Sequence, residues 1–293
     1  MKSQCTSKHP YAGRTAVLAT KHGKERQIAP FLRVALDLQV SVPPDLDTDL
    51  LGTFSGELPR QGSPIQVALQ KARMGMWASG LTLGLANEGS FGPHPAFPML
   101  IADTEILVFV DDERGIQVQE VLVSEQAIAA QCTTRSLDEI APFLERVLFP
   151  SHGLIVRPLA ALATLSPDQI IKGITDTATL ARAIEQSAAL SPDKLAHIET
   201  DLRANMNPTR RRIIRRVAAC LARRLARLCP QCATPGWGQV DVVCGLPCEW
   251  CGGATALVRE EISGCPSCSY REYTPRSDHK RTAPAAQCPF CNP

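Results

Sequence analysis

The sequence lacks any long apolar run. No stretch approaches the roughly 18 to 20 uncharged apolar residues that a membrane span needs, and residues 1–14 contain no apolar core of a signal peptide. These absences predict a cytoplasmic protein with no membrane partner. Net charge is also low, at +2 over 293 residues, which argues against a surface coated with positive charge for nucleic acid.

The composition that is present is that of a folded protein. Hydrophobic residues make up 44% of the chain and charged residues 20%, so most of it can bury enough apolar surface to fold. A chain of 293 residues exceeds the usual size of a single core, which predicts one large domain and a smaller one.

Short apolar runs alternate with helical periodicity along the first two thirds of the chain. Ser63 and Pro64 are typical of a helix start, and the turn residues 111–115 predict a hairpin between the strands on either side. The expected strands are residues 15–20, 81–86, 105–110, 116–123 and 153–157, and the expected helices follow residue 23 and cover 64–78, 137–147 and 178–187.

This alternation predicts an α/β fold with a mixed sheet. We expect an α/β domain over residues 1–190, a helical arginine-rich connector over 191–228, starting at Ser191, and a small zinc module over 229–293.

Eight of the twelve cysteines form four Cys-x-x-Cys pairs near the C-terminus. Two residues between ligands allow one tight turn to direct both sulfurs at one ion, so the pattern predicts two structural zinc ions in a double zinc ribbon. The absence of a signal peptide favours metal over disulfides. The expected ligands are Cys229, Cys232, Cys248, Cys251, Cys265, Cys268, Cys288 and Cys291.

Spacing alone leaves the pairing of these ligands open. Fifteen residues separate the first two pairs and nineteen separate the last two, and both gaps suit four-cysteine sites. Of the two arrangements, sequential and interleaved, we expect the sequential one. Cys5, Cys132, Cys220 and Cys244 are expected to be ordinary thiols.

An arginine-rich segment precedes the zinc module. Its side chains either contact RNA or DNA phosphates or form a solvated face paired with acids such as Glu199 and Asp201. The eight arginines are Arg210, Arg211, Arg212, Arg215, Arg216, Arg223, Arg224 and Arg227. The aromatic side chains of the module offer either stacking surfaces or its core; these are Trp237, Trp250, Tyr270, Tyr273 and Phe290.

Several segments of the first domain resemble one enzyme group. Residues 18–25 (LATKHGKE), 68–72 (ALQKA) and 83–90 (LGLANEGS), followed by 111–115 and 172–176, resemble in order and spacing the nucleoside triphosphate pyrophosphatases of the inosine/xanthosine triphosphatase and Maf-like group. The pattern departs from that group where Lys21 and His22 replace its usual Asn and Ser90 replaces its second Gly. The whole chain also resembles a bacterial family described as a domain of unknown function, through residues 52–57, 88–95, 199–204 and 291–293.

The resemblance and the residue chemistry together predict a phosphate site. A strand that delivers Thr20, Lys21 and Lys24 to a helix N-terminus can bind phosphates through backbone N–H groups and lysine charge. Acidic side chains would hold Mg²⁺ or Mn²⁺ or activate water, and the candidates are Glu57, Glu88 and Asp111, with Asp103 as an alternative to Asp111. Ser90 and His94 complete the predicted phosphate-binding set.

Two functions are therefore expected from different classes. The first is a nucleotide-binding protein that hydrolyses nucleoside triphosphates or related phosphoanhydrides with a divalent metal. The alternative is a non-enzymatic protein that binds nucleic acid through the zinc module and residues 210–227. A third reading gives the zinc module only a packing or assembly role, and a homodimer stays open.

Overall fold

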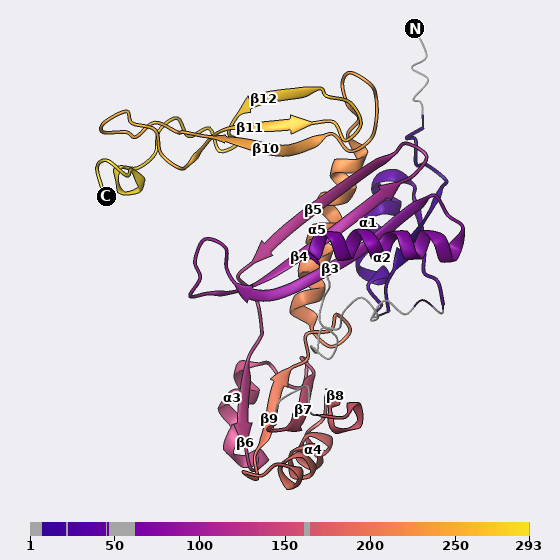
Figure 1. The fold of residues 1–293 in the computed structure, drawn as a ribbon, viewed down its shortest axis with the longest axis vertical. Helices are drawn as coiled ribbons and strands as arrows, with labels where there is room; N and C mark the ends of the chain where they lie inside the picture. The colour runs from indigo at the N-terminus through magenta and orange to yellow at the C-terminus, as the bar shows by residue number, and fades with distance from the viewer. Residues whose placement is uncertain (1–7, 22, 45, 47–61, 161–164, 293) are drawn as a thin grey trace.

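The described residues form three β-sheets, which Figure 1 shows arranged along the longest axis with the largest sheet in the middle. The computed structural model describes residues 8–21, 23–44, 46, 62–160 and 165–292. Mixed α/β structure is confirmed. Among the described helices, none is long and apolar enough to cross a membrane.

The central sheet has five strands in the order β2-β1-β3-β4-β5. Its strands are β1 Thr15–Ala19, β2 Gln39–Ser41, β3 Leu83–Pro93, β4 Ile101–Asp111 and β5 Ile116–Ser124. The first three are parallel, whereas β3, β4 and β5 form antiparallel hairpins. The expected hairpin at residues 111–115 is confirmed, and it closes with Gly115 at φ +64° and with the Asp111 carboxylate accepting the N–H groups of Glu113 and Arg114.

Helices cover both faces of this sheet. Helix α2 (Pro64–Ser79) packs on one face, and α1 (Glu25–Leu36) and α5 (Pro208–Ala226) pack on the other. The predicted start of α2 is confirmed: the Ser63 hydroxyl accepts the Gln66 N–H, and the Gln66 side chain accepts the Ser63 N–H in return.

Strand β3 extends well beyond its parallel neighbour. The pairing with β1 covers residues 17–19 against 84–86, so the segment from Asn87 to Pro93 lies past the end of β1. The loop that joins β1 to α1 therefore meets the middle of β3. This arrangement positions the candidate site.

The second sheet has the order β6-β9-β7-β8 and its own core. It comprises β6 Gln131–Thr134, β7 Leu154–Pro158, β8 Ile171–Ile174 and β9 Ala196–Thr200, with α3 Ala141–Arg146 and α4 Thr177–Leu190. The helix expected over 137–147 is a 3-10 turn, Leu137–Ile140, followed by the short α3. Residues 1–190 thus contribute to two sheets with separate cores, and β9 completes the second.

The prediction of a helix that begins at Ser191 is wrong. Ser191 instead ends α4, where its hydroxyl donates to the Ser187 carbonyl and accepts the Leu159 N–H. The next segment is β9, in which the side chain of Ile198 faces the core of the sheet. A serine followed by proline is typical of a helix start, but the same residues also terminate a helix.

Helix α5 is a core helix rather than a connector. Its apolar side chains, Ile214, Val217, Ala218, Leu221, Ala222 and Leu225, belong to the same buried cluster as the central sheet. Figure 1 shows α5 running past the central sheet from the second sheet to the third. The arginines of this segment draw attention to its charge, but its apolar residues recur at helical spacing and form one regular face.

We expect Leu221→Ala to lower the free energy of unfolding by about 2 to 5 kcal/mol, because it removes a fully buried side chain from this core. Trp77→Ala on α2 is the control, since Trp77 is 90% exposed and its loss should change stability by less than about 0.5 kcal/mol. Urea unfolding measures both. Equal effects would contradict the core position of α5.

Candidate functional site

The eight predicted cysteines form two groups of four. One contains Cys229, Cys232, Cys265 and Cys268, and the other contains Cys248, Cys251, Cys288 and Cys291. Sulfur–sulfur distances within the groups are 3.5, 3.6, 3.8 and 3.9 Å. Four sulfurs at about 2.3 Å from a tetrahedral zinc ion lie about 3.8 Å apart, so each group fits one zinc ion.

The sequential pairing is wrong, because the two sites interleave. The third sheet has antiparallel strands β10 Gly238–Cys244, β11 Val258–Gly264 and β12 Arg271–Pro275. The start of β10 and the β11–β12 turn meet at one end of this sheet, and the β10–β11 turn and the chain after β12 meet at the other. Cysteine pairs one and three therefore share one site, and pairs two and four share the other.

Backbone N–H groups support the thiolates in these turns. The sulfur of Cys248 accepts the Trp250 N–H at 3.4 Å, and that of Cys265 accepts the Ser267 N–H at 3.3 Å. Such donors favour the charged sulfur that binds metal. With four thiolates each, the sites leave no open position for catalysis, so zinc would serve the fold of the module.

The aromatic side chains of the module divide into two sets. Trp237 is buried and stacks on Tyr270 with ring centroids 5.4 Å apart, as expected for a small core. Trp250, Tyr273 and Phe290 are exposed. Among the remaining thiols, Cys244 lies on β10 outside both groups, and Cys5 lies outside the described residues.

Zinc stoichiometry of double variants separates the two pairings. We expect the double variant Cys229→Ser/Cys251→Ser to lose both zinc ions, because it removes one cysteine ligand from each site. Cys229→Ser/Cys268→Ser should lose only one, since both residues belong to one site. Elemental analysis of the purified variants gives the counts, and the reverse result would contradict the interleaved arrangement.

A second concentration of charge lies where β3 passes the end of β1. Thr20 directly follows β1 and is buried, and its hydroxyl has no hydrogen-bond partner among the described residues. Lys24 starts α1, and its ammonium donates to the Asn87 carbonyl at 2.8 Å. The buried ammonium group of Lys24 therefore lies against β3 at the carboxyl end of the parallel strands.

On the α2 side of β3, Glu88 meets Lys71. Their side chains are both buried, and Lys71 Nζ lies 2.5 Å from Glu88 Oε1. Glu88 and Ile106 are paired across β3 and β4, and Ile106 belongs to the core under α2. The lysine comes from the apolar face of α2, between Ala68 and Ala72.

On the other side of the strand, Glu105 of β4 meets Arg210 of α5. Arg210 Nε donates to Glu105 Oε1 at 2.5 Å, and the Asn87 amide donates to Glu105 Oε2 at 2.8 Å. Gly89 lies opposite Glu105, and a Cβ there would come within 2.6 Å of its carboxylate. The absence of a side chain at Gly89 thus leaves room for the Arg210–Glu105 ion pair to lie against the backbone of β3.

Burial changes the charge balance of the cluster. Burial, and then the nearby charge of Arg210, lower the pKa of Lys24 to about 8. Burial, and then the negative charge of Glu105, raise the pKa of Asp103 to about 8, and neither Asp103 oxygen has a hydrogen-bond partner among the described residues. The cluster contains three basic side chains, Lys24, Lys71 and Arg210, and three acidic ones, Glu88, Glu105 and Asp103, and burial favours the neutral form of Asp103.

The structure brings some predicted site residues together and separates others. Thr20, Lys24 and Glu88 converge, and Ser90 lies two residues along β3 on the face of Glu88. Lys21 is exposed in the same loop. Glu57 lies outside the described residues.

Asp111 and His94 lie elsewhere. Asp111 ends β4, about 16 Å along the strand from the residue opposite Glu88, and it binds Tyr11, Arg114 and the hairpin turn. His94 lies in the β3–β4 turn, where its Nδ1 accepts the N–H groups of Ala96 and Phe97. Both side chains are engaged in turns.

Lys71 and Glu105 were not among the predicted site residues, and Arg210 was predicted only as one of eight arginines for nucleic-acid phosphates or a solvated face. Each leaves a signal in the sequence: Lys71 interrupts the apolar face of its helix, and Glu105 opens an apolar strand. Arg210 lies three and four residues before Ile213 and Ile214, which places it on the buried face of α5. Periodicity therefore distinguishes it from the other arginines.

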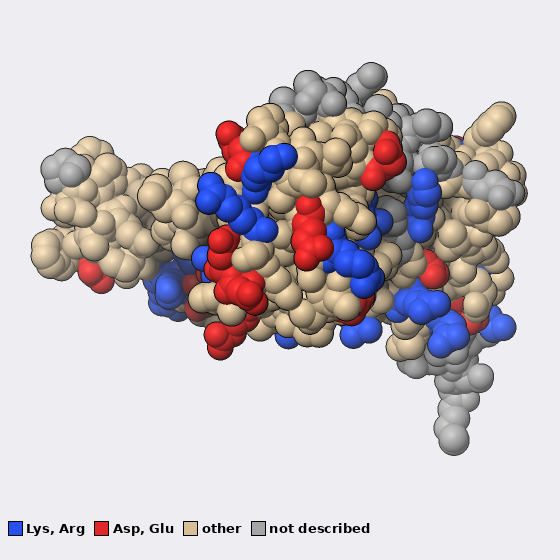
Figure 2. All heavy atoms as spheres, turned by 90° about the horizontal axis from the view of Figure 1, so that it is seen from below, with Lys and Arg blue, Asp and Glu red and all other residues tan. Residues whose placement is uncertain are grey.

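The remaining arginines make mixed contacts. Arg224 donates to the Gln119 carbonyl at 3.0 Å, to Glu120 at 3.1 Å and to the Gly236 carbonyl at 3.2 Å, and so joins α5 to β5 and to the zinc module. Arg215 donates to Gln27. Figure 2 shows the molecule from below, where basic and acidic side chains are interspersed rather than gathered by sign.

A family model matches residues 71–293 of this chain, which include Glu88, Glu105, Arg210 and all eight paired cysteines. The chain belongs to the family described as Domain of unknown function (DUF6671). Searches of curated proteins and of solved structures returned no match. In this member of DUF6671, Thr20 and Lys24 precede the matched range and meet it at β3.

The raised pKa of Asp103 predicts a pH dependence of stability. The folded state holds this proton up to about pH 8, whereas an unfolded aspartate releases it near pH 4, so stability should fall as pH rises from about 4 to 8. The slope contributed is at most about 1.4 kcal/mol per pH unit.

Asp103→Asn should remove this contribution, and urea unfolding at pH 5, 6, 7 and 8 measures it. Asp112→Asn is the matched control, because Asp112 is half-exposed at the far end of the sheet. An Asp103→Asn variant with the slope of the wild type would contradict the buried, protonated carboxyl.

Proposed function

We propose that the cluster around Lys24, Lys71 and Glu88 binds the phosphates of a nucleotide and hydrolyses a phosphoanhydride bond with Mg²⁺ or Mn²⁺. The observation that carries the proposal is the group of three buried basic side chains, Lys24, Lys71 and Arg210, near the carboxyl end of the parallel strands. A buried ammonium group is stabilised by a negatively charged partner, so buried lysines at this position favour an anionic ligand. Ligands of open α/β sheets bind at this edge.

The surrounding groups suit phosphate oxygens. Lys24 and Lys71 can each neutralise an oxygen, and the Thr20 hydroxyl can donate to one. The loop that carries Thr20 leads into the N-terminus of α1, whose first backbone N–H groups point out of the helix. These donors come from three separate elements that the fold brings together.

Glu88 is the residue we assign to the chemistry. Its carboxylate would hold the divalent ion or position water once phosphate competes for Lys71. The resemblance of residues 15–190 to the nucleoside triphosphate pyrophosphatases supports the same assignment. The metal would supply charge neutralisation on the phosphates.

Phosphate release from a panel of canonical and deaminated nucleoside triphosphates, with added pyrophosphatase and Mg²⁺ or Mn²⁺, tests the proposal. Glu88→Gln should lower turnover by at least about 100-fold, because a neutral amide holds a divalent ion more weakly than a carboxylate and cannot accept a proton. Glu185→Gln, exposed on α4, is the matched control and should retain the activity. Thermal unfolding of both variants establishes that they fold.

Unchanged hydrolysis in Glu88→Gln would remove this residue from the mechanism. Absence of turnover on every member of the panel by a folded, metal-loaded wild type would overturn the enzymatic part of the proposal. Binding of tripolyphosphate to the wild type, weakened in Lys71→Gln, tests the phosphate site separately from catalysis.

A further inference from the structure

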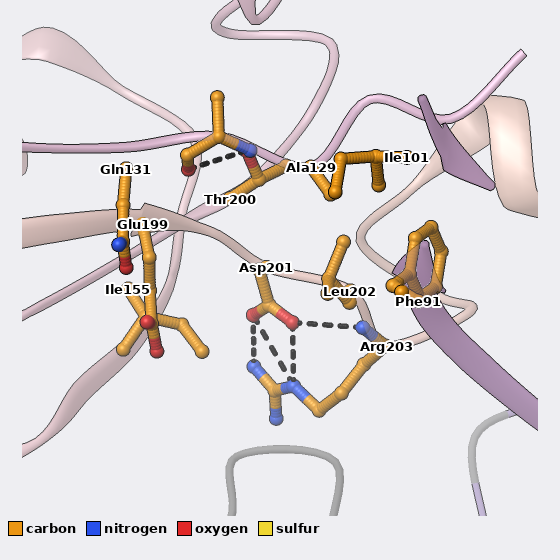
Figure 3. A pocket seen from close by; sticks show the side chains of 12 residues that line it. Phe91, Ile101, Ala129, Gln131, Ile155, Glu199, Thr200, Asp201, Leu202 and Arg203 are labelled. Carbon is orange, nitrogen blue, oxygen red and sulfur yellow. Dashed lines mark hydrogen bonds and ion pairs between the residues drawn. The ribbon is translucent and has the colours of Figure 1, made fainter. Parts of the chain in front are cut away.

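A cavity of about 410 Å³ lies between the central sheet and the second sheet. Figure 3 shows its two walls: Phe91 and Ile101 come from β3 and β4, and Gln131, Ile155 and Glu199 come from the second sheet. None of these residues belongs to the phosphate cluster described above. The cavity therefore needs an explanation of its own.

The second sheet presents a row of three side chains to this cavity. Gln131 of β6 and Ile155 of β7 each pair with Glu199 of β9, so the three residues lie side by side across the strands. Their neighbours Cys132, Val156 and Ile198 contact the core on the opposite face. Directly paired residues have Cβ atoms about 5 Å apart, so the Gln131 amide and the Glu199 carboxylate can act on one ligand.

Other charged groups at the cavity are already engaged with each other. Asp201 is fully buried and binds Arg203 through both carboxylate oxygens, at 2.6 to 3.2 Å, and also accepts the Gly173 N–H at 3.1 Å. Glu199 is different, because its partner is His197 at 3.4 Å and its side chain keeps 29% exposure. It is the carboxylate with capacity to accept hydrogen bonds from a ligand.

Arg210 joins this cavity to the phosphate cluster. Its Nη1 donates to the Leu202 carbonyl at 2.7 Å, and its guanidinium lies 6.0 Å from the centre of the Phe91 ring. Leu202 and Phe91 both line the cavity. Phe91 follows Glu88 by three residues and therefore lies on the opposite face of β3, the face of Gly89 and Arg210. Lys24 lies past the end of β1, close to Arg210 and Glu105 on this face and to Glu88 and Lys71 on the other, so phosphates at Lys24 suit a ligand whose ring lies at Phe91.

We infer that the cavity binds the guanine ring of a guanosine phosphate, and this inference rests on the proposed phosphate site. A carboxylate such as Glu199 accepts both the ring N–H and the amino group on the Watson–Crick edge of guanine, and the Gln131 amide can donate to its O6. Adenine has an acceptor nitrogen in place of that ring N–H, and the lone pair of this nitrogen would repel the Glu199 carboxylate. Phe91 and Ile101 provide the apolar surface against the ring.

Equilibrium binding measurements with non-hydrolysable guanosine and adenosine triphosphate analogues test this specificity. The wild type should prefer guanosine, and Glu199→Gln should reduce the preference by about 5- to 150-fold, as expected for one bidentate contact. Glu185→Gln is the matched control with the same charge change on an exposed helix. Thermal unfolding shows whether Glu199→Gln folds.

Equal binding of the two analogues by the wild type, or an unchanged ratio in folded Glu199→Gln, would overturn the guanine assignment. Guanosine without phosphates and tripolyphosphate without a base separate the two proposals. Loss of guanosine discrimination with retained tripolyphosphate binding contradicts only the cavity. Absence of tripolyphosphate binding, with guanosine still preferred over adenosine, contradicts only the phosphate site.

Discussion

The buried ion pair between Arg210 and Glu105 is the constraint on which the arrangement of the protein depends. Both side chains are almost fully excluded from water, and a buried charge without a partner is strongly destabilising. Arg210 is fixed by α5, Glu105 by β4, and the second oxygen of Glu105 by Asn87 of β3. This interaction thus holds the first turn of α5 against the sheet, and the apolar face of the helix packs along the rest.

Helix α5 also contacts the chain next to both outer sheets, one at each of its ends. Arg210, in its first turn, donates to the Leu202 carbonyl, just beyond β9, while Arg224, in its last turn, donates to the Gly236 carbonyl inside the zinc module. Near the first turn, Thr209 contacts His152 through its hydroxyl at 3.0 Å and fixes a second connection to the second sheet. The cavity and the zinc module are therefore placed by the same helix that completes the charged cluster.

Local sequence signals predicted most of the elements, because hydrophobic periodicity and turn residues act over a few residues. The capping box at Ser63, the turn at Asp111 and the Cys-x-x-Cys turns all express short-range geometry. The zinc pairing needed the strand order of the third sheet, which spacing does not contain. The convergence of Lys71, Glu105 and Arg210 likewise depends on contacts between residues up to 105 positions apart.

A double-mutant cycle on Glu105→Gln and Arg210→Gln, measured as the free energy of unfolding, tests this account most directly. Each single change should cost about 3 to 5 kcal/mol, because it leaves the other charge buried. The double variant should cost less than the sum by at least about 2 kcal/mol, since the two losses are one interaction. Additive costs within about 0.5 kcal/mol would contradict the central place of the pair.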